Sequence, residues 1–251
     1  QNEQTIEAWI NANFNTLNHT EQILTIPVVV HVVYRTADEN ISDNRIYEQL
    51  QILNQDYRNQ NPDGANVPAP FQMYRGDAKV EFCLAQRTPD NLPTTGIERR
   101  QTTAFSFSTN LNSPVKFYSQ GGLDAWNTTQ YLNIWVCALS SNYLGFAQFP
   151  GGNPLTDGVV IDYRYFGISG AIAPYNKGRT LVHEVGHYFN LYHIWGDDEN
   201  ATNTCSGTDY CSDTPNQQYE NYGTPSYPLI DDCSPSAPGI MFMNYMDYVD
   251  D

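Results

Sequence analysis

The sequence predicts one domain of mixed α/β (α+β) class, with an ordered upper lobe followed by an irregular lower lobe. The first observation is residues 25–34, TIPVVVHVVY, a β-branched run typical of a strand buried on both faces. The second is a following segment with helical apolar spacing, succeeded by further strand-like runs. The third is that prolines interrupt every regular pattern after Gly196, so this part cannot form a core of its own. We therefore expect a lobe boundary near residue 190 and a cleft between the lobes.

The upper lobe, about residues 25–190, contains five segments with the composition of strands. These are Thr25–Tyr34, Val80–Leu84, Tyr131–Val136, Tyr143–Phe149 as an edge strand, and Gly158–Ile161. Ser42 is the expected N-cap of a helix that ends before Pro62 and whose apolar positions are Ile46, Leu50, Leu53 and Tyr57. A second helix is expected over Lys177–Leu191. His31, inside the first strand, is expected to be a hydrogen-bonded core residue and not a ligand.

The N-terminal residues 1–20 are mostly polar, and Ile6, Trp9, Ile10 and Phe14 form a short amphipathic pattern among them. This pattern predicts either a short helix or the tail of a pro-segment. No signal peptide is visible at Gln1, so we expect the chain to be a processed form.

Composition excludes several classes of function. The 251 residues carry 12 Lys+Arg against 28 Asp+Glu, for a formal charge of −16. Such an acidic chain repels phosphate backbones and anionic lipid, which argues against nucleic-acid and membrane partners. No apolar run approaches the roughly 18 residues that a membrane span needs. The 40% hydrophobic content is enough for a core at this length.

Five cysteines indicate the compartment. Three of them, Cys205, Cys211 and Cys233, lie in a 29-residue stretch rich in turn-forming residues. Disulfides are the usual source of stability in such a stretch. Zinc binding by these three is the alternative, although no C-x-x-C pair is present. We favour a secreted protein that contains a disulfide.

The segment Thr180–Gly196, TLVHEVGHYFNLYHIWG, contains the pattern of a metal site. His183 and His187 are four residues apart, so a helix presents both imidazoles on one face to a single metal ion. Glu184 is placed to act on a water at the remaining coordination position without being a ligand. A chance H-E-x-x-H in a structural helix is the alternative, but His193 adds a third histidine at the expected offset.

His193 can reach the metal only if the helix stops and the chain turns back. The extended motif has glycine for this purpose at the position of Asn190. Asparagine is the non-glycine residue that best tolerates the left-handed region. We therefore expect a positive φ angle at Asn190.

A second motif, MNYMDY, follows His193 by about 50 residues and resembles the Met-turn of the metzincins. The resemblance assigns Met246 to the apolar floor under the three histidines. Tyr248 stands where several metzincins have a tyrosine near zinc, and its phenol could donate to the developing oxyanion. Packing of Tyr248 under the loop, without a catalytic role, is the alternative.

With these motifs the chain resembles the pappalysin family of metzincin zinc metallopeptidases, especially its compact prokaryotic members, over Ile26–Asp251. The flanking segments DGVVID and DYCSDTPNQ add to the likeness. The resemblance implies a metzincin-like zincin with a twisted mixed sheet and two long helices in the upper lobe. It also implies a lower lobe, about residues 191–251, with a Met-turn, and a zinc cleft between the lobes. Residues 25–251 would be the catalytic domain, and residues 1–24 a pro-segment remnant or an N-terminal extension.

The same resemblance suggests calcium in the lower lobe, with hard oxygen ligands from Asp209, Asp213 and Thr214. An ordinary acidic loop is the alternative. The resemblance also implies a disulfide between Cys205 and Cys233. Cys211 would then be unpaired, or paired outside this chain, and the remaining two cysteines, Cys83 and Cys137, are expected to be buried thiols.

These expectations amount to a secreted, monomeric zinc endopeptidase that acts on proteins or peptides, with Glu184 as the general base. The edge strand near Gly145, Phe146 and Ala147 would pair with an extended substrate. Asp250 and Asp251 would favour a basic residue just after the scissile bond, as the prokaryotic relatives do. Three alternatives remain: a catalytically silent metal-stabilised binding module, a zinc hydrolase of non-peptide amides, and a latent form in which residues 1–24 inhibit the peptidase.

Overall fold

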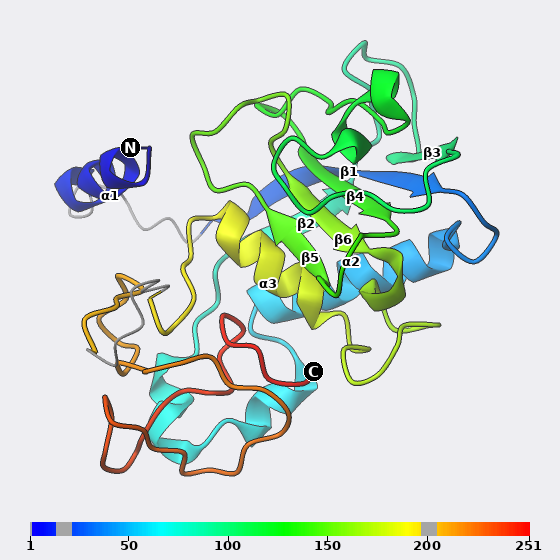
Figure 1. Ribbon diagram of the computed structural model, residues 1–251. Coiled ribbons are helices and arrows are strands. Elements are labelled where there is room, and N and C mark those ends of the chain that lie inside the picture. The colour runs from blue at the N-terminus through cyan, green and yellow to red at the C-terminus, as the bar shows by residue number, and fades with distance from the viewer. Residues whose placement is uncertain (1, 14–21, 197–204) are drawn as a thin grey trace.

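The computed structural model describes residues 2–13, 22–196 and 205–251. A twisted sheet lies over two helices, and a part of the chain without regular structure lies beyond those helices (Figure 1). Phe14, assigned above to the N-terminal apolar set, falls outside the described residues. In the described ranges no helix has the length and apolar character that a membrane span requires.

The sheet has six strands and is mostly parallel. They are β1 (Leu24–Tyr34), β2 (Val80–Leu84), β3 (Ile97–Gln101), β4 (Leu132–Cys137), β5 (Gly145–Ala147) and β6 (Val159–Asp162). Their order is β2-β1-β4-β6-β5, and β3 pairs with the C-terminal half of β1. Only β5 is antiparallel to its neighbour, and it lies at the edge of the sheet. The expected mixed sheet is therefore confirmed.

The described residues form three α-helices: α1 (Asn2–Asn13), α2 (Asp43–Tyr57) and α3 (Arg179–Tyr188). Five short 3-10 helices connect other segments: η1 (Pro62–Asn66), η2 (Ala69–Tyr74), η3 (Pro114–Lys116), η4 (Tyr118–Gln120) and η5 (Tyr163–Tyr165). Ser42 is the predicted N-cap of α2, and its hydroxyl accepts from the Arg45 N–H at 3.3 Å. That bond satisfies one of the free N–H groups of the first turn.

The main core lies between the sheet and helices α2 and α3. Leu181 and Val185 of α3 are fully buried against the strands, so this helix is fixed on its apolar side. The opposite side faces the cleft described below. His31 is also fully buried, with Nδ1 2.9 Å from Glu98 and Nε2 3.0 Å from the side-chain oxygen of Asn133. It is the hydrogen-bonded core residue that was expected.

Two elements differ from the sequence-based expectation. The strand expected over Tyr143–Phe149 is only three residues long, and β3 was not predicted. The sequence of β3, IERRQ, has a single apolar residue, Ile97, which packs against the core while no residue of the strand is buried. Its arginines instead bind nearby loops: Arg99 donates to the Ile41 carbonyl at 2.7 Å.

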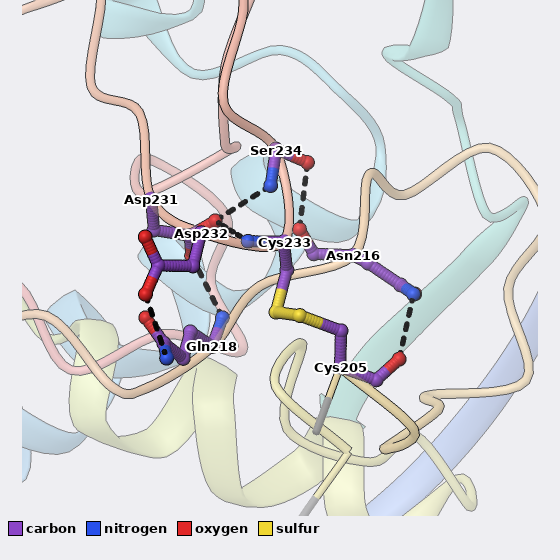
Figure 2. Close-up of a disulfide and its surroundings, with 7 residues drawn as sticks. All are labelled: Cys205, Asn216, Gln218, Asp231, Asp232, Cys233 and Ser234. Atoms are coloured by element: carbon purple, nitrogen blue, oxygen red, sulfur yellow. Dashed lines mark hydrogen bonds between the residues drawn. A yellow bond between two sulfur atoms is a disulfide. The ribbon is translucent and has the colours of Figure 1, made fainter. Parts of the chain in front are cut away.

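The C-terminal part, residues 205–251, contains no helix or strand and is held by a disulfide and by carboxylates. Cys205 and Cys233 form the predicted disulfide (Figure 2). Asp231 accepts from the N–H groups of Gln218, Cys233 and Ser234 beside it. These bonds satisfy backbone groups that have no regular-structure partner.

The remaining three cysteines are free thiols. Cys137 is buried, as expected, and Cys211 is half-buried and unpaired. The expectation that Cys83 is buried was wrong, because its side chain is exposed. In β2 the neighbouring Phe82 points into the core, so Cys83 points to the opposite face at this edge of the sheet.

Lys116 supports β5 from inside the protein. Its side chain is fully buried, its amine lies 5.2 Å from the ring centres of both Trp135 and Phe146, and it donates to the Thr156 carbonyl. Phe146 belongs to β5, and Thr156 ends the loop between β5 and β6. The lysine therefore fixes both the edge strand and the loop that follows it.

Burial lowers the pKa of the Lys116 amine to about 8, although Asp157 opposes the shift. An unfolded chain has a lysine pKa of about 10.4. Between these values the unfolded state binds more protons, so for this group the free energy of unfolding rises with pH. A Lys116→Met variant lacks this dependence.

We compare the free energy of unfolding of wild type with that of Lys116→Met. Between pH 7.5 and 10.5 the wild-type value should rise by about 3 kcal/mol relative to the value of the variant. Urea unfolding at several pH values measures this difference, and the comparison cancels other groups that titrate in both proteins. A difference that stays constant over the range would contradict a charged amine held in the core.

Candidate active site

Helix α3 and the turn after it bring three histidines together. The Nε2 atom of His187 lies 3.1 Å from that of His183 and 3.0 Å from that of His193. The third separation, between His183 and His193, is 3.3 Å. The sequence motif therefore corresponds to one cluster of side chains at the surface of the cleft.

The reversal at Asn190 places His193. Asn190 has a φ angle of +73°, as predicted. Its N–H donates to the His187 carbonyl, and the N–H of Leu191 donates to the Gly186 carbonyl, both at 2.9 Å. This pair of bonds is a Schellman motif, which ends the helix and satisfies its last carbonyl groups. The chain then returns toward the helix and carries His193 to the other two histidines.

Backbone carbonyls orient two of the imidazoles. His183 Nδ1 lies 2.7 Å from the Tyr245 oxygen, and His187 Nδ1 lies 2.8 Å from the Leu191 oxygen. A carbonyl can only accept, so each Nδ1 carries the proton and each Nε2 presents a lone pair to the cluster. The two lone pairs of His183 and His187 meet at an Nε2–Nε2 distance of 3.1 Å and repel each other unless a cation lies between them.

The spacing of the three nitrogens fits zinc. Ligands around a tetrahedral ion with bonds of about 2.0–2.1 Å are about 3.3 Å apart, close to the separations found here. In the described parts of the chain, these histidines are the one group of three His, Cys, Asp or Glu residues whose ligand atoms converge within 4.8 Å. The residues therefore suit a tetrahedral zinc site with an open fourth position.

Glu184 and β5 line the same site. Burial raises the pKa of the Glu184 carboxyl to about 8. Gly145 of β5 packs directly against this side chain, since a Cβ atom there would lie 3.0 Å from Glu184 Cγ and 2.9 Å from the Val160 carbonyl. Glycine at this position thus allows the edge strand to pass next to the carboxylate.

The Met-turn lies under the histidines. Met246 is buried, and a Cβ atom at Gly186 would lie 2.5 Å from its sulfur, so the helix and the turn are in close contact. The Met246 carbonyl accepts from the N–H of Ile194, next to His193, at 3.3 Å. This arrangement agrees with a floor beneath the three histidines.

Asp247 holds the turn in place, a role that was not predicted. Its carboxylate accepts from the N–H and the side-chain amide of Asn221, both at 2.8 Å, and from the Gln217 amide at 2.9 Å. Gln217 is the last residue of the DYCSDTPNQ segment. The likeness of this segment to the family was the available signal that it has a structural role. The two motifs of the lower lobe are therefore in direct contact.

Tyr248 lies beside the cluster. Its ring centre is 4.8 Å from that of His193, 5.6 Å from that of His183 and 4.9 Å from that of Trp195. Its side chain is therefore next to the position of the metal and not remote under the loop.

A cavity of about 1080 Å³ extends from the histidines. Every residue proposed above to bind substrate lines it: Gly145, Phe146, Ala147, Asp250 and Asp251. The two aspartates differ in availability. The Asp251 carboxylate accepts from the backbone N–H groups of Lys177 and Arg179 at the start of α3. The Asp250 carboxylate has no hydrogen-bond or ion-pair partner among the described residues.

A cluster around Arg179, which lines the same cavity, was also missed. Its Nη1 lies 2.9 Å from both carboxylate oxygens of Asp56 and 2.9 Å from the Tyr245 hydroxyl, and its Nη2 lies 2.9 Å from Asp63. Arg179 stands four residues before His183 and hence on the same helix face. That spacing was the signal that could have identified it.

The expected calcium ligands lie near one another, since the Asp209 carboxylate is hydrogen-bonded to the Thr214 side chain and interacts electrostatically with Asp213. The Asp209 carboxylate accepts from the Cys211 N–H at 2.9 Å, and the Thr214 N–H donates to the Cys211 carbonyl at 3.3 Å. These bonds shape the loop. Asp213 belongs to no three-residue ligand group in the ranges that the structure covers. Calcium binding therefore stays a prediction.

The left-handed turn can be tested with matched substitutions at residue 190. A residue with a Cβ atom is strained at this φ angle, and glycine is not. We expect Asn190→Ala to lower the free energy of unfolding by about 1 kcal/mol more than Asn190→Gly, and to weaken zinc binding more. Both variants lose the 2.7 Å bond from Asn190 to Glu7, so that loss cancels. Urea unfolding and zinc competition titrations measure these effects; equal results for alanine and glycine would contradict the strain.

Comparisons with known proteins agree with this site. The peptidase M43 family, described as pregnancy-associated plasma protein-A, matches residues 119–251. An extracellular metalloprotease of Arthroderma otae is 28% identical over 90% of this chain and 70% of its own length. Another, from Pyricularia oryzae, is 29% identical over 98% of this chain and 74% of its own.

Two solved structures are similar throughout. Mature mirolysin of Tannerella forsythia, in complex with a cleaved peptide, is 51% identical, with a TM-score of 0.89 over 92% of this chain and 86% of that one. A promirolysin variant is 49% identical, with a TM-score of 0.92 over 99% and 81%. The predicted pappalysin resemblance is confirmed. The chain belongs to peptidase family M43, the pappalysin-type metzincins, and is a metalloendopeptidase.

Proposed function

We propose that this protein is a secreted zinc endopeptidase that uses Glu184 as general base and prefers a basic residue just after the scissile bond. The observation that carries this proposal is the cluster of three Nε2 atoms beside a buried Glu184, at one side of a large cleft. The extracellular metalloproteases among its relatives support secretion.

His183, His187 and His193 would hold the zinc ion, which when bound polarises the scissile carbonyl and acidifies a water molecule. Glu184 would take a proton from that water during attack and pass it to the leaving amine. The Tyr248 hydroxyl would donate to the carbonyl oxygen as negative charge develops on it. The backbone carbonyls of Tyr245 and Leu191 keep two of the imidazoles in the required tautomer.

Strand β5 would bind the substrate in extended form. One of its edges pairs with β6, and its other edge faces the cavity beside Glu184. The free backbone groups of such an edge can pair with an added strand. The complex of mirolysin with a cleaved peptide is in line with a peptide substrate here.

Residues 1–24 would be the remnant of a pro-segment. In support, the promirolysin variant covers 99% of this chain and mature mirolysin covers 92%. Helix α1 also touches the zinc motif, because Glu7 accepts a hydrogen bond from Asn190 at 2.7 Å. A segment attached at this point could delay activity until it is removed.

Glu184→Gln tests the proposed base. The substitution preserves size but not proton acceptance, so we expect cleavage of a denatured protein to fall by about 10²–10⁴-fold. Zinc content by metal analysis and the unfolding midpoint should match wild type. Activity within tenfold of wild type would contradict the mechanism. A zinc-loaded wild type without any cleavage would instead favour a metal-stabilised binding module.

Cleavage-site profiling on a diverse peptide library tests the substrate preference. Because Asp250 is a carboxylate of the cleft that is neither the proposed base nor paired with a donor of the described residues, we expect Arg and Lys to be enriched immediately after the cut. Asp250→Asn should reduce this enrichment at least fivefold, whereas Asp90→Asn, remote from the cavity lining, should not. Enrichment of Leu and Phe in wild type would overturn the proposed preference.

A further inference from the structure

Arg179 is an internal cation of the substrate cleft. It lies in the first turn of α3 and joins three other segments: the end of α2 through Asp56, η1 through Asp63, and the Met-turn through Tyr245. All four residues line the same cavity as the three histidines. A substrate side chain that enters this cavity is therefore exposed to the charge of Arg179.

The paired carboxylates differ in exposure. The Asp56 side chain is 1% exposed, and the Asp63 side chain is 44% exposed. Burial raises the pKa of Asp56 to about 6, against the opposing effect of Arg179. At pH 8 Asp56 is therefore ionised, and the Arg179 cation lies against this carboxylate and that of Asp63.

Asp251 is similarly engaged, through the backbone N–H groups at the start of α3. By contrast, Asp250 is unpaired among the residues that the structure describes. The cleft thus holds several carboxylates, but most of them already interact with donors of the protein. Arg75 and Lys177 also line the cavity, and Arg179 is the cation that lies within 2.9 Å of the carboxylates of both Asp56 and Asp63.

We propose that Arg179 is a specificity-determining residue. Its cation neutralises Asp56 and Asp63, so that Asp250 is the carboxylate left, apart from the catalytic Glu184, to attract a basic substrate side chain. This inference rests on the proposed peptide-binding cleft and deepens it. It predicts that the charge of the cleft depends on both residues. Removal of the Arg179 charge should strengthen the attraction of a basic substrate side chain, and removal of the Asp63 charge should weaken it.

The experiment compares two peptides that differ only in the residue after the scissile bond, arginine or citrulline. Citrulline has the size of arginine without its charge, so the ratio of the two dissociation constants reports the electrostatic contribution alone. Binding is measured by calorimetry at pH 8 in the Glu184→Gln background, which prevents turnover. Arg179→Gln, Arg179→Lys and Asp63→Asn are each added to this background.

We expect Arg179→Gln to raise the preference for arginine over citrulline at least fivefold, because it removes a repelling cation. Arg179→Lys should stay within twofold of the parent, because it retains the charge. Asp63→Asn should lower the preference at least twofold. A merely structural role would weaken both peptides equally and leave the ratio unchanged.

Unchanged ratios in the Arg179→Gln and Asp63→Asn variants would overturn the inference. If Arg179→Gln does not fold, the Asp63→Asn variant still tests the inference, because Asp63 is half-exposed and its replacement buries no unpaired group. In that variant, a preference for arginine over citrulline that does not fall would refute the charge balance. Failure of the proposed function has a separate signature. In that case wild type binds the peptides and the ratios change as expected, but no peptide is cleaved.

Discussion

The geometry of the site depends on where helix α3 ends. Two imidazoles one turn apart can share a metal, but a third cannot join them from the same helix. The helix must therefore stop soon after His187, and the chain must reverse within a few residues. The Schellman motif at Asn190 makes this reversal and satisfies the carbonyls of Gly186 and His187. The positions of His193 and Ile194, and through Ile194 the contact with the Met-turn, all follow from it.

The acidic composition has a structural use in the part of the chain that lacks helices and strands. Asp231 accepts from three backbone N–H groups, and Asp247 accepts from backbone N–H groups and from side-chain amides. Asp251 does the same at the start of α3. These carboxylates replace the regular hydrogen bonds of secondary structure. The charge of −16 is thus not only a surface property, since part of it fixes the floor and wall of the cleft.

Local patterns in the sequence were sufficient for much of the fold and for the centre of the site. The strand at residues 25–34, the cap at Ser42, the zinc histidines and the positive φ at Asn190 are each encoded by neighbouring residues. Strand β3, the exposure of Cys83 and the Arg179 cluster were not predictable in this way. Each depends on segments that are distant in sequence: Arg179 contacts residues 123 and 116 positions earlier. The resemblance to a family adds the lower-lobe motifs but not the bonds between them.

Two close approaches keep the active parts aligned, although residues 205–251 contain no helix or strand. Gly145 allows β5 to touch Glu184, and Gly186 allows Met246 to touch the zinc helix. In both places a side chain would push apart elements that must act together. Glycine within a helix costs about 1 kcal/mol relative to alanine, so Gly186 lowers the intrinsic stability of α3. The contact with Met246 and the burial of Leu181 and Val185 offset that cost. The position of the catalytic helix is therefore set by tertiary packing on both of its sides, and not by its own propensity.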